Sequence, residues 1–282
     1  MKVKLLRTQA QIHFETLKIS NMKPLRKFTI GSMLLFSMLF SLLHLSSCKK
    51  DKDPVLDTEL TGKAGTFENN IIAVDGEERS YRLVVSSKLN LTTPNKIIFA
   101  FHGLGIDSKD LMPVYSKLNE LAESSNALIV YPSAQGESWG LNQKQIDKDV
   151  TFFELLLAKI QSKYAIDENN IHITGMSNGA YFCHIVAKNY SEKIASVTAH
   201  SGMIGLEFIL GINAKRKYPV LLVHGIKDPI FSITTARNDL SKYKNEKHPA
   251  HLIEVDDLGH EWANKININD SIAVFINKDP LN

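Results

Sequence analysis

The segment 175–179 has the pattern Gly-x-Ser-x-Gly, and Ser177 is its central residue. A strand-like run, Ile171–Thr174, precedes it, and a helix-like run, Ala180–Ala187, follows it. A serine at a sharp strand-to-helix turn exposes its hydroxyl, and glycines on either side let neighbouring backbone pass close by. The sequence therefore predicts a nucleophile elbow with Ser177 as the nucleophile of a serine ester hydrolase.

An acid and a base follow Ser177 in the order that this type of site requires. Asp228 comes directly after the apolar run 218–225, which suits a buried parallel strand. His260 follows a glycine beyond the next strand-like run, 250–255. We expect His260 to take the proton of Ser177 and Asp228 to orient and stabilise the imidazolium. Asp256 and Asp257 are rivals for the acid, although they lie close enough to His260 to shape its loop instead.

A second glycine turn ends the apolar run 96–101 and has the sequence His102-Gly103-Leu104-Gly105. Such a loop can supply one backbone N–H to a substrate oxyanion, and the residue after the nucleophile supplies another. The predicted donors are Leu104 and Asn178. The alternative is an ordinary turn at the end of a strand, which would be preferred if Ser177 were absent.

Strand-like and helix-like segments alternate along the chain, which predicts an α/β fold with a mainly parallel sheet covered by helices on both faces. The expected strands are 81–85, 97–101, 127–131, 171–174, 195–199, 220–223 and 251–255. The expected helices are 111–124, 149–164, 180–189, 233–244 and 271–276. Every proposed catalytic residue then lies at the carboxyl end of a strand, where active sites of such sheets form.

Several short motifs occur together in an order that resembles one group of α/β-hydrolases. They are His102-Gly103, Tyr131-Pro132, Ser138-Trp139, Asp149-Val150, the segment 174–179, the segment 224–229 and the segment 259–262. Together they resemble the polyhydroxybutyrate depolymerase and feruloyl esterase group over about residues 82–262. The resemblance implies hydrolysis of carboxylic esters through an acyl-enzyme, without a metal or an organic cofactor. It also implies a substrate cleft near Trp139 and His102.

The amino terminus has the features of a lipoprotein signal. Basic residues at 23, 26 and 27 precede an apolar run, 28–45, which ends in Leu45-Ser46-Ser47-Cys48. This predicts a signal peptide over 1–47, lipid on Cys48, a tether over 48–65 and a catalytic domain over 66–282. The alternative is an uncleaved anchor, because eighteen mostly apolar residues approach the roughly 20 that span a bilayer. The expected location is the cell envelope, at the periplasmic face or the cell surface.

The net charge of +3 depends on this leader, which carries seven basic and one acidic residue. The remaining 235 residues carry 26 basic and 29 acidic side chains, so their net charge is −3. Nucleic-acid binding is therefore not expected. No Cys or His cluster has metal-ligand spacing, and Cys183 reads as a small buried residue. Two other functions stay open: a non-catalytic binding lipoprotein that keeps the fold, and a serine peptidase.

Overall fold

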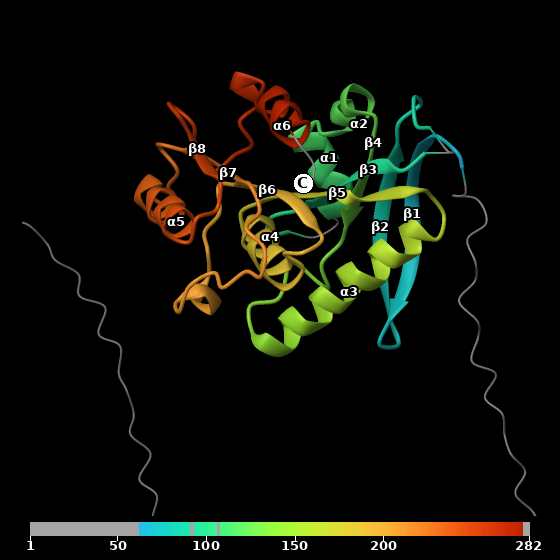
Figure 1. Ribbon diagram of the computed structural model, residues 1–282, viewed down its shortest axis with the longest axis horizontal. Coiled ribbons are helices and arrows are strands. Elements are labelled where there is room, and N and C mark those ends of the chain that lie inside the picture. Colours follow the sequence, from blue (N-terminus) through green and yellow to red (C-terminus); the bar gives the residue numbers. More distant parts are fainter. Residues whose placement is uncertain (1–61, 91–92, 106–107, 279–282) are drawn as a thin grey trace, which may run out of the picture. The chain divides into compact units, whose positions relative to one another are not determined.

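The computed structural model describes residues 62–90, 93–105 and 108–278, and these residues build an eight-stranded sheet flanked by helices (Figure 1). The strand order is β1-β2-β4-β3-β5-β6-β7-β8. Strands β3 to β8 run parallel, whereas β2 is antiparallel to both β1 and β4. The strands are β1 Gly65–Val74, β2 Glu77–Val85, β3 Asn95–Phe101, β4 Ala127–Pro132, β5 Ile166–Met176, β6 Ile194–His200, β7 Val220–Gly225 and β8 Ala250–Val255. The expected mainly parallel α/β sheet is confirmed.

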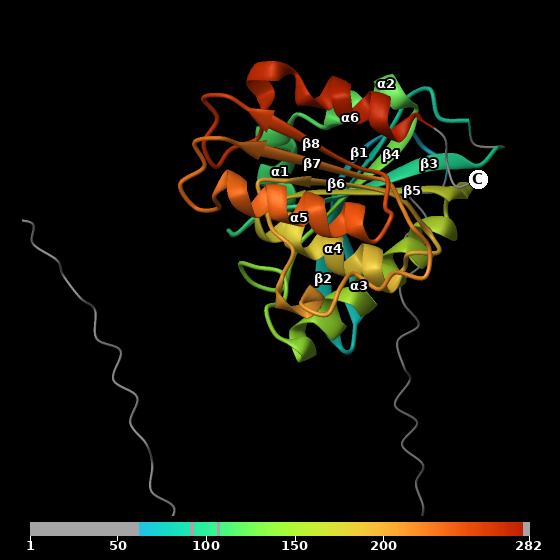
Figure 2. The same ribbon diagram turned by 60° about the vertical axis from the view of Figure 1, so that its left-hand side comes forward.

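Helices cover both faces of the sheet, as Figure 2 shows with α1, α2 and α6 on one face and α3, α4 and α5 on the other. Alternate side chains of one strand enter opposite cores: Phe99 and Phe101 pack on the α3 and α4 side, and Ile98 packs on the α1, α2 and α6 side. The helices are α1 Ser108–Ser116, α2 Asn119–Ser125, α3 Gln143–Gln161, α4 Asn178–Asn189, α5 Ile233–Asn245 and α6 Ile268–Ile276.

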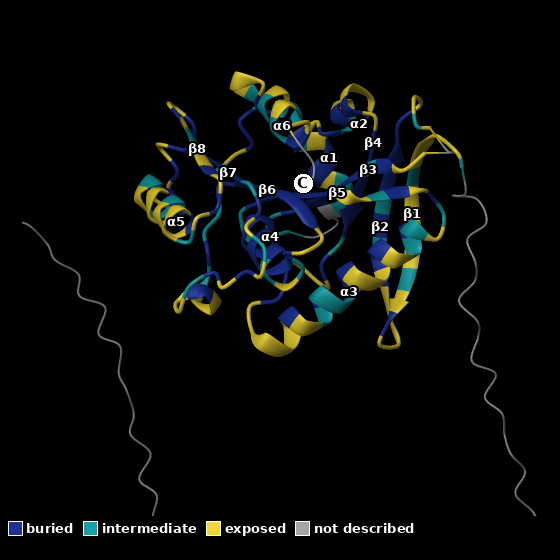
Figure 3. Cartoon of the chain, viewed as in Figure 1, coloured by how far each residue is buried: buried dark blue, intermediate teal, exposed yellow. Residues whose placement is uncertain are grey.

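Two elements differ from the sequence-based expectation. Strand β1 was not expected, because it is an edge strand whose residues are mostly exposed, and its polar and apolar residues do not alternate regularly (Figure 3). The helix expected over 111–124 is two helices, α1 and α2. The chain breaks between them at Lys117, whose φ of 54° is left-handed and ends the first helix.

The leader, Cys48 and most of the tether lie outside the described residues. Within the part of the chain that the structure describes, no helix is long and apolar enough to cross a bilayer.

Candidate active site

Ser177 occupies a strained turn between β5 and α4. Its φ of 55° and ψ of −118° lie outside the ordinary regions for a residue with a side chain, and its N–H donates to the His200 carbonyl at 2.9 Å. The two flanking glycines make this turn possible. A Cβ on Gly175 would strike the backbone of Gly179, and a Cβ on Gly179 would strike the carbonyl oxygens at the end of β3. This is the geometry of a nucleophile elbow.

Three side chains from different strand ends form one hydrogen-bonded relay. The Ser177 Oγ lies 2.9 Å from Nε2 of His260, and Nδ1 of His260 lies 2.8 Å from Oδ2 of Asp228. A neutral imidazole that donates from Nδ1 to the carboxylate leaves Nε2 free to accept the serine proton. The structure therefore brings together the three residues selected from the sequence. The rival Asp257 instead forms an ion pair with Lys227 at the surface.

Backbone N–H groups of the loop after β7 stabilise the ionised form of Asp228. Its Oδ1 accepts the backbone N–H groups of Ile230 at 2.8 Å and Phe231 at 3.0 Å. Burial acts to raise the pKa of Asp228, but the hydrogen bonds from Phe231, His260 and Ile230 outweigh it, so the pKa lies below its ordinary value. The carboxylate thus stays ionised at neutral pH and faces the imidazole without competing for its proton.

His224 supports the same loop and was missed in the sequence. Its Nε2 lies 2.7 Å from the carbonyl oxygen of Phe231, to which it donates, and 3.5 Å from Oδ2 of Asp228. Its place at the end of β7, four residues before the acid, could have identified it. His224 holds the backbone that presents its N–H groups to Asp228.

The glycine turn after β3 runs directly against the nucleophile. A Cβ on Gly103 would lie 3.4 Å from the Cβ of Ser177, so the backbone of this turn borders the serine. Among the described residues, no hydrogen bond of the fold uses the backbone N–H of Leu104 or of Asn178. Both N–H groups, which are the two predicted oxyanion donors, are therefore available to a ligand.

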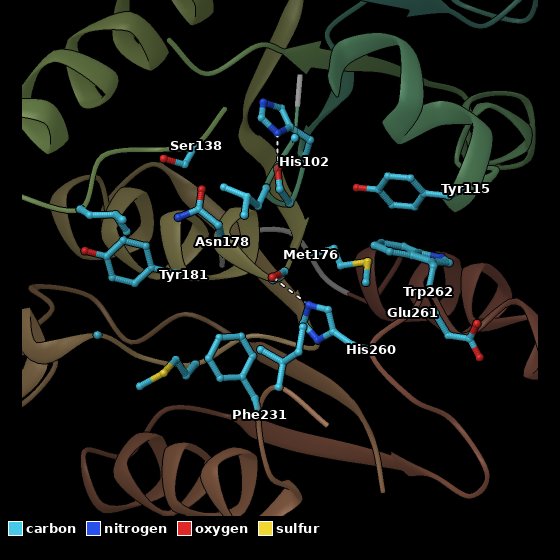
Figure 4. Close-up of a pocket in the computed structure, with 18 of the residues that line it drawn as sticks. His102, Tyr115, Ser138, Met176, Asn178, Tyr181, Phe231, His260, Glu261 and Trp262 are labelled. Carbon is cyan, nitrogen blue, oxygen red and sulfur yellow. Dashed lines mark hydrogen bonds between the residues drawn. The ribbon is translucent and has the colours of Figure 1, made fainter. Parts of the chain in front are cut away.

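The relay opens into a cleft of about 910 Å³ (Figure 4). Its walls are mainly apolar. The apolar and aromatic residues that line it are Leu104, Leu111, Tyr115, Leu141, Met176, Tyr181, Met203, Leu206, Ile230, Phe231 and Trp262. A cavity of this size and character suits a small organic molecule.

Trp139 does not line this cleft, contrary to the expectation. Its side chain is fully buried, stacked on Phe182 with ring centroids 4.5 Å apart, and its Nε1 donates to the His102 carbonyl at 3.0 Å. The aromatic ring points into the core between β3 and α4 because the neighbouring phenylalanines provide an apolar site there. Only the backbone of Trp139 meets the site, where its N–H donates to Oδ1 of Asn178 at 2.7 Å.

His102 borders the cleft, but its ring is fully engaged. Its Nε2 accepts the N–H of Ala134 at 2.9 Å, and Nδ1 donates to the Gly103 carbonyl at 2.5 Å. Burial is the main reason that the pKa of His102 falls to about 4, so the ring is neutral at pH 7. His102 therefore holds two loops together and has no nitrogen left for chemistry.

Most of the other residues that line the cleft were not selected from the sequence. Tyr181 could have been, because it lies four residues after Ser177 and so on the same face of α4. Phe231, Glu207 and Met203 lie in loops without a periodic pattern, and only the fold brings them to the site. His200, at the end of β6, is fully buried and accepts the N–H of Ala263 at 3.0 Å.

Within the described residues, no three His, Cys, Asp or Glu side chains are grouped so as to hold a metal ion. The free Cys183 is buried on α4, away from the hydroxyl of Ser177.

Comparison with known proteins places this site in a family. The family model described as phospholipase/carboxylesterase matches residues 137–278, which is half of the chain and includes all three relay residues. The chain belongs to the phospholipase/carboxylesterase family.

The chain is also similar in sequence to two feruloyl esterases and in structure to an acetyl xylan esterase. Feruloyl esterase D of Neurospora crassa is 27% identical over 190 residues, which are 62% of this chain and 63% of that protein. Probable feruloyl esterase C of Aspergillus niger is 25% identical over 175 residues, 60% of this chain and 61% of that protein. The chain thus spans about six tenths of the length of these curated relatives. The crystal structure of acetyl xylan esterase from Aspergillus awamori superposes with a TM-score of 0.61 at 15% identity, covering 75% of this chain and all of that one, and so shows the α/β-hydrolase fold.

Proposed function

We propose that this protein is a serine carboxylic ester hydrolase that acts through an acyl-enzyme. The observation that carries the proposal is the relay from Ser177 through His260 to Asp228, which opens into an apolar cleft beside two available N–H donors. Membership of the carboxylesterase family and the feruloyl esterase names of the relatives support the same chemistry.

In the first half-reaction, His260 removes the proton from Oγ of Ser177 as this oxygen attacks the ester carbonyl carbon. The carbonyl oxygen becomes an oxyanion that accepts hydrogen bonds from the N–H groups of Leu104 and Asn178. One such donor contributes about 3 kcal/mol to the stability of the transition state. His260 then gives its proton to the departing alkoxide, so the alcohol leaves and the acyl group stays on Ser177.

In the second half-reaction, a water molecule takes the place of the alcohol. His260 accepts a proton from this water as it attacks the acyl carbon, and returns the proton to Ser177 when the acid departs. Asp228 stays ionised throughout and stabilises the imidazolium in both halves.

For the substrate, we propose feruloyl or acetyl esters of polysaccharide, or short hydroxyalkanoate esters. The cleft volume accommodates an aromatic acyl group, and its apolar walls favour burial of such a group. The names of the relatives favour the polysaccharide esters, whereas the hydroxyalkanoate esters rest on sequence motifs alone.

The test is a panel of 4-nitrophenyl acetate, longer 4-nitrophenyl esters, methyl ferulate and hydroxybutyrate oligomers, with Ser177→Ala measured alongside. We expect the wild type to hydrolyse at least one ester and the variant to lose several orders of magnitude in kcat. Circular dichroism controls for folding of the variant. Equal turnover by a folded Ser177→Ala variant, or no turnover of any ester by the folded wild type, would falsify the proposal and favour a binding role.

We also propose that lipid on Cys48 attaches the protein to a membrane of the cell envelope, which rests on the sequence alone. Cys48→Ser should block processing and lipid attachment. Labelling with a radioactive fatty acid in cells is the measurement, and undiminished labelling of this variant contradicts the proposal.

A further inference from the structure

The charged side chains of the cleft all have the same sign. Among the described residues that line it, the carboxylates are Glu207 and Glu261, and none is a lysine or an arginine. His260 belongs to the relay, and His102 is neutral because burial lowers its pKa to about 4. A substrate that enters the cleft therefore meets apolar walls and two acidic groups.

The two carboxylates belong to different sides of the cleft. Glu261 follows His260, the group that gives a proton to the departing alcohol, and thus lies on the alcohol side. Glu207 lies beside Tyr181 of α4. Figure 4 shows Tyr181 and Trp262 on opposite sides of Met176 and His260. An acyl group that extends away from His260 on the Tyr181 side of the cleft would meet Glu207.

Only one of these carboxylates has a cationic partner. Glu261 lies 3.6 Å from Nζ of Lys265, so its charge is partly balanced. No ion pair within the described part of the chain involves Glu207. The nearby Lys188 donates to the backbone carbonyl of Glu207 at 3.3 Å, and no ion pair joins its ammonium to the carboxylate.

The local backbone holds the Glu207 carboxylate beside the Tyr181 ring. A Cβ on Gly205 would strike both Oε2 of Glu207 and the ring of Tyr181, so this glycine allows the two side chains to meet. Burial, followed by the hydrogen bond to Glu207 and its charge, raises the pKa of the Tyr181 hydroxyl. The hydroxyl therefore keeps its proton and can supply one hydrogen bond to the carboxylate, which has capacity to accept more.

We infer that Glu207, positioned by Tyr181, determines specificity for the acyl group. It selects esters whose acyl group ends in a hydrogen-bond donor, such as a hydroxyl or an ammonium, and it disfavours acyl groups that end in a carboxylate. The Glu207 carboxylate is exposed at the cleft and has no ion-pair partner among the described residues, so it repels a like charge and attracts a hydrogen-bond donor brought beside it. The inference rests on the proposed ester hydrolysis and names the acyl class on which that hydrolysis acts.

The experiment compares three 4-nitrophenyl esters that differ only at the far end of the acyl group: those of 3-phenylpropanoic, 3-(4-hydroxyphenyl)propanoic and 3-(4-carboxyphenyl)propanoic acid. Two saturated carbons separate the substituted ring from the ester carbonyl, so the intrinsic reactivities of the three esters are similar. We expect the wild type to prefer the hydroxyl over the carboxylate ester in kcat/KM. Glu207→Gln, which keeps the size but removes the charge, should reduce this ratio at least about fivefold.

Two variants control for unrelated effects. Glu120→Gln removes an exposed charge on α2, outside the cleft, and Glu261→Gln removes the charge on the alcohol side. Neither should change the ratio between the acyl groups. An unchanged ratio in Glu207→Gln, or equal use of the hydroxyl and carboxylate esters by the wild type, overturns the inference. The unsubstituted ester separates the two proposals: if the wild type hydrolyses it but Glu207→Gln leaves the ratio unchanged, only this inference fails, whereas the proposed function fails only if the folded wild type hydrolyses none of these esters and none of the panel above.

Discussion

Two loops line the cleft, and they are held in different ways. The loop 133–142 is held by a buried ion pair between Arg79 of β2 and Asp149 of α3, 2.9 Å apart. Arg79 also donates to the Ser133 carbonyl, and Asp149 accepts the N–H of Gly140 at 2.7 Å. At the site itself, Oδ1 of Asn178 accepts an N–H from this loop. The backbone of this wall is therefore tied to charged groups that water does not reach.

The loop 201–217 has a different construction. Asp239 accepts the N–H of Ile204 at 2.8 Å, and Glu246 accepts two further N–H groups of the loop near its end. Between these points Leu206, Ile209 and Leu210 are 81%, 74% and 88% exposed. The comparison indicates that the first wall fixes the catalytic geometry, whereas the second presents side chains that can change without disturbing the fold.

The largest effect should come from Asp149→Ala. The change leaves the Arg79 guanidinium buried without its partner and removes the acceptor for Gly140, so we expect a loss of about 3–5 kcal/mol in the free energy of unfolding. Urea denaturation measures this loss. Asp147→Ala, on the exposed face of the same helix α3, serves as the control and should cost far less. Equal losses in the two variants would contradict the role assigned to the buried pair.

Lowering the pH should reduce the free energy of unfolding by a smaller amount, through His102, which binds the same loop at Ala134. Because burial lowers the pKa of His102 to about 4, the unfolded chain binds its proton first as the pH falls. The stability that comes from neutral His102 is thus complete above about pH 6.5 and falls by about 3 kcal/mol as the pH approaches 4.

Urea denaturation at a series of pH values between 7 and 4 tests this sign. His102→Gln should reduce the pH dependence of the unfolding free energy by about one proton. The matched control is His251→Gln, because His251 is exposed on β8. A slope in His102→Gln that equals the wild-type slope would exclude this residue as a source of the acid sensitivity.

The smallest effect should come from Leu210→Ser on the other wall. The side chain is 88% exposed, so its replacement should change the free energy of unfolding by less than about 0.5 kcal/mol. Replacement of the neighbouring Phe208, which is fully buried, by alanine should cost about 3–5 kcal/mol. Similar losses for both positions would show that the exposed part of this loop is packed after all.

The sequence predicted the site well where local chemistry and strand order decide it. The glycine pattern around Ser177 and the positions of Asp228 and His260 after apolar runs were sufficient, because parallel strands bring their carboxyl ends to one edge. In the structure, these three side chains are joined by hydrogen bonds into the relay. All seven expected strands are present, and the central ones, such as β4, β6 and β7, are buried along their whole length, which explains their continuous apolar runs.

The remaining features depend on packing between segments that are distant in sequence. Trp139 was expected at the cleft, but β3 and α4 form an apolar site that holds its ring in the core. The contact between Gly205, Glu207 and Tyr181 arises from the path of one irregular loop. Strand β1 was missed because its residues are mostly exposed, and pairing with β2 rather than an apolar pattern defines it.

The position of β1 also has a mechanical consequence. The chain enters the described fold at the edge of the sheet, where the backbone of β1 pairs with β2 alone and Lys159 of α3 adds one side-chain hydrogen bond to the Ile71 carbonyl at 2.9 Å. Three further strands, β2, β4 and β3, lie between it and β5, which leads to Ser177. A pulling force on the amino-terminal side therefore acts first on an edge hairpin. Strand β1 can separate from β2 and absorb the load, while β2, which carries Arg79, and the strands behind the nucleophile, the acid and the base keep their register.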